Sequence, residues 1–207
     1  MPPHFPDLPG QFRIMRPFTR NKDPILAELL QRLPASGHAL EVAAGTGQHA
    51  AHFAAALPGW QWLPTEPDAA MLPVIAARCA HLPNVTAPQA LDVRIADWPI
   101  APASLDALYC ANMVHIAPWA CCEALMRGAG RCLRTGGWLL LYGPFIVDGK
   151  PLAPSNAAFD ADLRRRDPAW GLRRLEAVAQ AGEAAGLALA ERIAMPANNL
   201  LLVLRRR

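Results

Sequence analysis

The chain has 207 residues, a formal net charge of +3 and 53% hydrophobic residues. That length suffices for one domain with a sizeable core, and no uncharged apolar run is long enough to cross a membrane. Lysine is nearly absent, and the arginine clusters at 164–166 and 205–207 are more typical of solvated faces than of a nucleic-acid-binding module. We therefore expect neither a nucleic-acid nor a membrane partner.

Residues 1–20 are rich in proline and lack the basic start and apolar core of a signal peptide. We expect them to form an extended arm ahead of a single domain at 21–207. The five cysteines are scattered without a C-x-x-C pair, so reduced thiols in a cytoplasmic protein are the expectation. His49 and His52 stand three residues apart, but nothing completes a metal site beside them, and no metal is predicted. Nothing in the sequence indicates the oligomeric state.

Strands alternate with helices through the first two thirds of the chain. A helix is expected at 24–33, after a cap-like stretch that places a proline in the first turn. The next elements, in chain order, are a strand at 38–44, a helix at 48–57, a strand at 60–66, a helix at 69–80, strands at 85–92 and 105–113, a helix at 119–132 and a strand at 137–145. The strands are apolar runs without alternation, which is typical of a parallel sheet covered on both faces.

Residues 143–174 form a long polar connection with several prolines. Connections of this length in a compact domain are usually functional or disordered. The aromatic side chains of Phe145, Phe159 and Trp170 argue against disorder. We therefore expect this segment to be functional and to fold as a lid over the binding site described below.

The last part of the chain contains a helical pattern at 172–185 and two apolar runs at 187–196 and 198–207. These runs are close enough in sequence to pair as an antiparallel hairpin at one edge of the sheet. The sequence thus predicts an α/β fold with a Rossmann-like, doubly wound sheet that is mostly parallel and ends in a C-terminal antiparallel hairpin.

The stretch LEVAAGTGQHAAHFA, at residues 40–54, places two glycines between an expected strand and an expected helix. Backbone N–H groups and the positive end of the helix dipole then meet at the carboxyl edge of the sheet, where open α/β folds bind ligands. Gly45, Gly47 and Ala50 match G-x-G-x-x-A, and Glu66 follows where the acid that binds a ribose belongs. A tight turn without a ligand is the alternative. The local pattern serves NAD and S-adenosylmethionine (SAM) equally well.

Features further along the chain favour SAM. Asp92 ends an expected strand, where its carboxylate is suited to accept a hydrogen bond from an adenine amino group. Asn112 and Met113 end the next strand and are expected beside the bound ligand. The expected C-terminal hairpin is typical of a SAM-binding sheet and unusual for a nicotinamide-binding one.

The ordered blocks EVAAGTGQH, PTEPD, LDV, ANMVHIAPW, LYGPF, SNAAFDADLRRRDPAWG and MPANN resemble class I SAM-dependent methyltransferases, and within them a methyltransferase-like family described as a domain of unknown function. The resemblance covers about residues 21–204 and implies a seven-stranded sheet of the class I methyltransferase fold. The sequence departs from the class pattern at Ala43, where the first glycine of E-x-G-x-G-x-G would stand. The methyl group is small and precedes the turn, so the cofactor prediction stands.

The resemblance also implies a set of cofactor-binding residues. The set is Asn21, Glu41, Ala43, Gly45, Gly47, Glu66, Asp92, Asn112 and Met113. In it, Glu66 would hold the ribose, Asp92 the adenine, and Asn21 in the arm would close over the cofactor. Glu41 would steady the glycine loop, either by reaching the cofactor ammonium through water or by capping nearby N–H groups.

Methyl transfer from a sulfonium is an in-line displacement, so the protein mainly has to align the reacting atoms and exclude water. A general base is needed only when the nucleophile arrives protonated. His115 and Tyr142 are the candidate catalytic residues, with pocket lining or a structural role as alternatives. The candidate substrate-binding residues are His115, Trp119, Tyr142, Phe145, Asn156, Arg164, Trp170 and Asn199. Surface, turn or core roles are the alternatives for these.

The expected function is SAM-dependent methyl transfer to a small-molecule acceptor whose nucleophilic atom the sequence does not identify. An NAD-dependent oxidoreductase and a non-catalytic SAM-binding scaffold are the alternatives. Binding of NAD in place of S-adenosylhomocysteine (SAH) would indicate the first. A poorly formed pocket beneath residues 145–170 would indicate the second.

Overall fold

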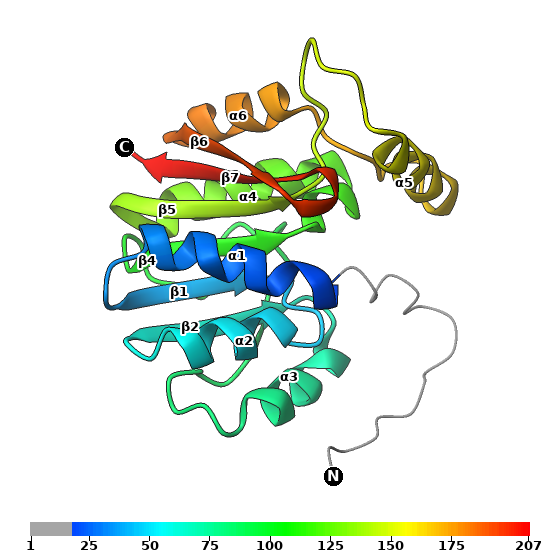
Figure 1. Cartoon of the computed structure of the whole chain (residues 1–207). Coiled ribbons are helices and arrows are strands. Elements are labelled where there is room, and N and C mark those ends of the chain that lie inside the picture. The colour runs from blue at the N-terminus through cyan, green and yellow to red at the C-terminus, as the bar shows by residue number, and fades with distance from the viewer. Residues whose placement is uncertain (1–17) are drawn as a thin grey trace.

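The computed structural model describes residues 18–207, and the side chains from residue 21 onward. Within this range seven strands form one mixed sheet in the order β3-β2-β1-β4-β5-β7-β6 (Figure 1). The strands are β1 (Gly37–Val42), β2 (Trp60–Glu66), β3 (Gln89–Ala90), β4 (Leu105–Ala111), β5 (Leu133–Gly143), β6 (Leu187–Met195) and β7 (Asn199–Arg206). The first five pair in parallel, whereas β7 lies antiparallel between β5 and β6. The predicted doubly wound sheet with a C-terminal hairpin is confirmed.

Helices cover both faces of the sheet (Figure 1). One face packs against α1 (Phe18–Arg32), α2 (Gln48–Ala56) and α3 (Leu72–Cys79), and the other against α4 (Trp119–Cys132) and α6 (Leu175–Ala184). The connections at 18–207 also contain short 3-10 helices: η1 (Ala69–Met71), η2 (Met113–His115) and η3 (Pro196–Asn198).

The central strand β4 shows why the apolar runs carry no alternation. All seven of its residues are buried, because helices cover both of its faces. Leu108 and Cys110 belong to the core beneath α4 and α6, whereas Ala107 and Tyr109 belong to the core beneath α1 and α2. In the part of the chain that the structure describes, no helix is both long and apolar enough to cross a membrane.

Two expected boundaries are wrong. The third strand, expected at 85–92, is reduced to Gln89–Ala90 and one isolated bridge between Val85 and Trp62. Pro88 lies between these contacts and has no N–H to donate, so it interrupts the ladder of this edge strand. Residues 18–20 of the expected arm form the first turn of α1, where Asn21 is already buried; residues 1–17 lie outside the described part.

The segment at 143–174 contains a helix that the sequence pattern did not predict, α5 (Pro154–Arg166). Only Asn156 and Leu163 are buried in it, so it has no apolar stripe from which a helix can be recognised. Pro154 opens the helix and Asp167-Pro168 ends it, because the residue before a proline avoids helical conformation. Figure 1 shows α5 apart from the two helix layers, on the side towards which β4 points.

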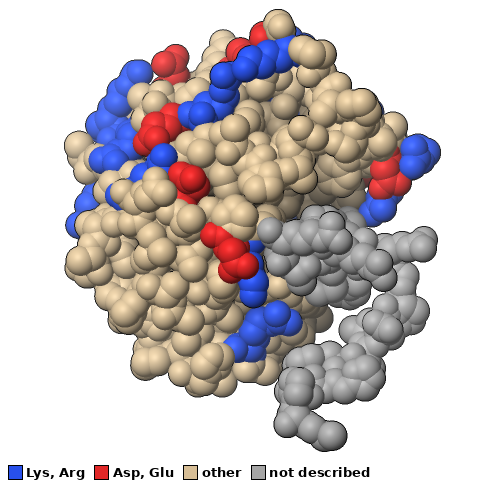
Figure 2. All heavy atoms as spheres, viewed as in Figure 1, with Lys and Arg blue, Asp and Glu red and all other residues tan. Residues whose placement is uncertain are grey.

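Charges on the face covered by α1, α2 and α3 are interspersed in sign, and large parts of that face carry none (Figure 2). Arg32 pairs with Glu28 and with Glu191, the latter at 2.8 Å. This face therefore presents mixed and partly neutralised charge.

Candidate cofactor pocket

The order of the strands defines a crevice at the carboxyl edge of the sheet. From β1 the chain proceeds outward through β2 and β3, whereas β4 and β5 lie on the opposite side of β1. Strand order therefore reverses between β1 and β4, and open α/β sheets bind ligands at such a point.

The two glycines of the loop after β1 have different surroundings. Both have positive φ, +59° at Gly45 and +72° at Gly47. A Cβ added to Gly47 would lie 2.9 Å from the side chain of Ile75, so this glycine allows α2 to approach α3. A Cβ added to Gly45 would meet nothing within 4 Å. The loop thus leaves open space beside its backbone at Gly45.

Glu66, at the end of β2, lies directly against that open stretch. Its Oε2 accepts a hydrogen bond from the backbone N–H of Gly45 at 2.8 Å, and burial raises the pKa of its carboxyl. Its other oxygen makes only a long contact of 3.5 Å with the N–H of Asp68. Oε1 therefore keeps the capacity to accept a hydrogen bond from a ligand.

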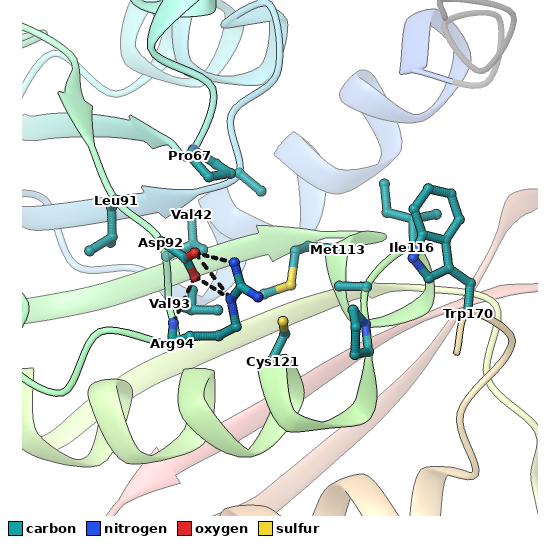
Figure 3. Close-up of a pocket in the computed structure, with 13 residues that line it drawn as sticks. Val42, Pro67, Leu91, Asp92, Val93, Arg94, Met113, Ile116, Cys121 and Trp170 are labelled. Carbon is teal, nitrogen blue, oxygen red and sulfur yellow. Dashed lines mark hydrogen bonds and ion pairs between the residues drawn. The ribbon is translucent and has the colours of Figure 1, made fainter. Parts of the chain in front are cut away.

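A pocket of about 230 Å³ opens beside this loop (Figure 3). It is lined by Val42, Ala43, Pro67, Leu91, Asp92, Val93, Arg94, Met113, Ile116, Ala117, Pro118, Cys121 and Trp170. The lining is apolar except for one acid and one base. Trp170 and Ile116 lie together at the end opposite Leu91 and Asp92 (Figure 3). Such a slot suits a flat, mostly apolar ring with a polar edge.

Four residues of the predicted sets line this pocket: Ala43, Asp92, Met113 and Trp170. Asp92 is held by Arg94, whose Nη2 lies 2.6 Å from Oδ2, and this pairing keeps the pKa of Asp92 low. Trp170 is contributed by the connection between α5 and α6. The other predicted residues do not line this pocket.

Strained backbone marks the ends of both strands at the reversal point. Ala43 follows β1 with φ +56°, and Asn112 follows β4 with φ +60°. Residues other than glycine rarely adopt this left-handed conformation, and where they do the surrounding structure holds them there. The N–H of Asn112 donates to the carbonyl of Tyr142 at 2.8 Å, which fixes that turn.

Glu41 lies inside the sheet rather than in the pocket lining. Its side chain faces the core beneath α2, where Oε2 accepts a hydrogen bond from Nε1 of Trp62 at 2.8 Å. Burial raises the pKa of Glu41 to about 8, so the carboxyl is mostly protonated at neutral pH. The hydrogen bond of this carboxyl group is the one with Trp62, and both expected roles of Glu41 stay predictions.

His115, the last residue of η2, is completely buried against the chain that returns from α5. Its Nδ1 accepts a hydrogen bond from the N–H of Arg173 at 3.3 Å, and its ring contacts the ring of Phe145 at 4.7 Å. Burial lowers the pKa of His115 to about 3, so the ring is neutral and carries its proton on Nε2. That nitrogen has no hydrogen-bond partner among the described residues.

Tyr142 and Asn21 belong to a polar group on the opposite face of the sheet. Asn21 hydrogen-bonds the side chain of Tyr142, and its Oδ1 lies 3.0 Å from Nε2 of His49. The hydroxyl of Tyr109 lies 3.2 Å from Nδ1 of the same histidine. Burial lowers the pKa of His49 to about 4. These contacts tie α1 to the first turn of α2, which follows the glycine loop.

The other predicted substrate-binding side chains make contacts within the protein. Trp119 donates to Glu123 at 3.0 Å, and Arg164 donates to Asp160 at 2.9 Å. Asn156 is buried and donates to the carbonyl of Asn198 at 2.9 Å. Asn199 donates to the carbonyl of Pro196 at 3.0 Å, as expected of a turn residue. None of these four side chains lines the pocket of Figure 3.

Three residues that matter here were missed by the sequence interpretation. Arg94 pairs with Asp92, and its spacing of two residues was the available signal. Arg173 donates to the carbonyls of Val114 and Ala117 at 2.8 and 2.6 Å, and so fastens the chain after α5 to the loop after β4. A Cβ on Gly143 would lie 2.5 Å from Nε2 of His115. Neither of the last two contacts has a local signal, because the partners are far apart in sequence.

The residues present fit an organic cofactor better than a metal. Among the described residues, no group of three or more His, Cys, Asp or Glu side chains is placed to hold a metal ion. All five cysteines are buried and free. An open loop backbone, one acid with a free oxygen and an apolar slot are instead the components that bind a nucleoside.

Comparisons with known proteins identify a matching family and several structures with a similar fold. A family model described as "Protein of unknown function (DUF938)" matches residues 13–206. The pyocyanin biosynthetic protein PhzM is 16% identical with a TM-score of 0.72, covering 88% of this chain and 54% of PhzM. A putative methyltransferase from Bacillus halodurans is 22% identical with a TM-score of 0.65, covering 81% of this chain and 70% of that one.

Another similar structure is of an SAH-bound protein. CalO1, a methyltransferase in calicheamicin biosynthesis solved in its SAH-bound form, is 17% identical with a TM-score of 0.69, covering 89% of this chain and 54% of CalO1. The chain thus spans about half the length of PhzM and of CalO1. At these identities the likeness shows the fold, which is the predicted class I SAM-dependent methyltransferase fold.

Proposed function

The chain belongs to the family described as "Protein of unknown function (DUF938)", and from that premise we propose that it is a SAM-dependent methyltransferase that acts on a small molecule. The observation that carries the proposal is the pocket at the carboxyl ends of β1 to β4, lined by Ala43 of the glycine loop and by Asp92. Further along the same loop, Gly45 has open space around it and donates its N–H to a second acid, Glu66. The SAH-bound form of CalO1, on the same fold, supports it.

In this proposal each part of the cofactor has its own group on the protein. The free Oε1 of Glu66 accepts from a ribose hydroxyl, and the backbone at Gly45 admits the part of the ligand that a side chain would block. Asp92 would accept from the adenine amino group, and Ala43 and Met113, which line the same pocket, would flank the ring. Bound SAM supplies a methyl group on a sulfonium, which is already electrophilic.

The remaining task of the protein is to align an acceptor and to exclude water. We assign this task to the 143–174 segment as a lid, because its Trp170 forms one end of the pocket. His115 and Tyr142 stay predictions as catalytic residues. His115 is a weak base at neutral pH, and the side chain of Tyr142 is paired with Asn21. An acceptor that arrives unprotonated needs neither as a base.

Calorimetric titration with SAH tests the proposal, with NAD as the competing ligand. We expect SAH to bind, NAD not to bind, and Glu66→Ala to weaken SAH binding about 10-fold or more, since a hydrogen bond to a charged group is lost. Glu183→Ala is the matched control, because Glu183 is an exposed acid on α6 that pairs with Arg207. Binding of NAD alone, or equal weakening in both variants, would contradict the proposal.

A further inference from the structure

The ion pair between Asp92 and Arg94 lies in an otherwise apolar pocket (Figure 3). Nε of Arg94 lies 3.0 Å from Oδ1 and 3.1 Å from Oδ2, and Nη2 lies 2.6 Å from Oδ2. The backbone N–H of the same arginine donates to Oδ1 at 2.9 Å. Three N–H groups of this one residue thus occupy both oxygens of Asp92. A ligand that hydrogen-bonds Asp92 therefore competes with Arg94.

Glu66 offers a direct contrast at the other acid of the pocket region. Its donor is the backbone of Gly45, which occupies one oxygen and leaves the other with only a 3.5 Å contact. A ribose hydroxyl can therefore be added without breaking a bond of the protein. The two acids thus differ. Glu66 can accept a hydrogen bond from a ligand without any change in the protein, whereas Asp92 can do so only in competition with Arg94.

The side chain of Arg94 can move away from Asp92. Its side chain is 63% exposed, so the guanidinium can move into water without losing a buried environment. An exposed ion pair changes an equilibrium constant by at most about fivefold, which is small enough for a ligand to overcome and large enough to measure.

From this geometry, and resting on the proposed function, we propose that Arg94 determines the affinity of the cofactor site by competing with the adenine amino group for Asp92. Only molecules in which Arg94 has released the carboxylate can make that hydrogen bond. The apparent affinity is then reduced by the fraction of molecules in which the pair is closed. Arg94 acts against binding although it lines the site.

Titration of the wild type and four variants with SAH tests this competition. Arg94→Ala is expected to bind SAH about two- to fivefold more tightly than the wild type, and Asp92→Ala to bind it about tenfold more weakly. In the Asp92→Ala background, adding Arg94→Ala should change nothing, because the contested group is gone. Arg165→Ala is the matched control, since Arg165 makes an exposed ion pair with Asp162 at 2.8 Å on α5.

The outcomes separate this inference from the proposed function. Weaker or unchanged binding in Arg94→Ala, with SAH still bound by the wild type, overturns the competition and leaves the cofactor assignment standing. Tighter binding in both the Arg94→Ala and the Arg165→Ala proteins overturns it too, because a general charge effect then suffices. Absence of SAH binding in every protein overturns the proposed function, and the inference with it.

Discussion

Two regions of the candidate site are built in different ways. The glycine-loop region, residues 41–47 with Glu66, is shaped by backbone conformation and leaves open space at Gly45. The His115 junction, which comprises His115, Gly143, Phe145 and Arg173, is closed by side-chain contacts between residues as far as 58 positions apart. The first region leaves open space beside the backbone, and the second fastens the end of the 143–174 segment to the loop after β4.

The largest effect is expected at the junction, from Gly143→Ala. The added Cβ would lie 2.5 Å from Nε2 and 2.7 Å from Cδ2 of His115, a ring with no room to move. We expect the free energy of unfolding to fall by about 3 kcal/mol, as for severe overpacking. Chemical denaturation measures this change.

The pairing of these two residues can be checked in a double-mutant cycle. His115→Ala removes the ring that Gly143→Ala would strike, so the double variant should be more stable than the sum of the single effects predicts. Additive losses would show that the clash is relieved elsewhere and that the junction is less rigid than the contacts indicate.

Next in size is Gly47→Ala in the glycine-loop region. The backbone has φ +72° there and the Cβ would lie 2.9 Å from Ile75, so we expect a loss of about 2 kcal/mol. Gly45→Ala adds the strain of a positive φ but no steric clash, so we expect the free energy of unfolding to fall by about 1 kcal/mol. SAH binding should show the reverse order, with the larger loss in Gly45→Ala. Equal effects of the two variants on binding would contradict the separate roles of the two glycines.

Glu41 makes the glycine-loop region sensitive to pH. Burial raises its pKa from 4.5 to about 8, so the folded protein holds a proton that the unfolded chain has released. Its contribution to stability is complete below pH 4.5 and is lost as the pH rises towards 8. His49 and His115 have lowered pKa values and act in the opposite direction, but only below their ordinary value of 6.5.

Between pH 6.5 and 8 these histidines contribute little, and a variant at Glu41 separates its effect from that of Glu66, whose carboxyl pKa burial also raises. The free energy of unfolding of the wild type should fall there by up to about 2 kcal/mol, since each pH unit contributes at most about 1.4 kcal/mol per proton. Denaturation curves of Glu41→Gln should show no such fall, because the amide does not titrate. An equal slope in both proteins would mean that another group is responsible.

The difference between the two regions also explains what the sequence could predict. The spacing of Gly45, Gly47 and Glu66 is local, so strand, turn and acid could be placed from the pattern alone. The junction depends on distant partners, and α5 is polar on nearly all sides, so neither has a periodic signal. Pro88 was visible, but its effect on an edge strand depends on pairing that only the fold defines.

The smallest expected effect concerns Ala43, and it tests whether backbone strain shapes the glycine-loop region. With φ +56°, Ala43→Gly should relieve strain and raise the free energy of unfolding by about 0.5 kcal/mol after the entropic cost of glycine. Ala44→Gly is the matched control: its φ is not positive, so it should lose about 0.5–1 kcal/mol. Because Ala43 lines the pocket, weaker SAH binding by the more stable Ala43→Gly protein would indicate that the strained methyl group contacts the cofactor.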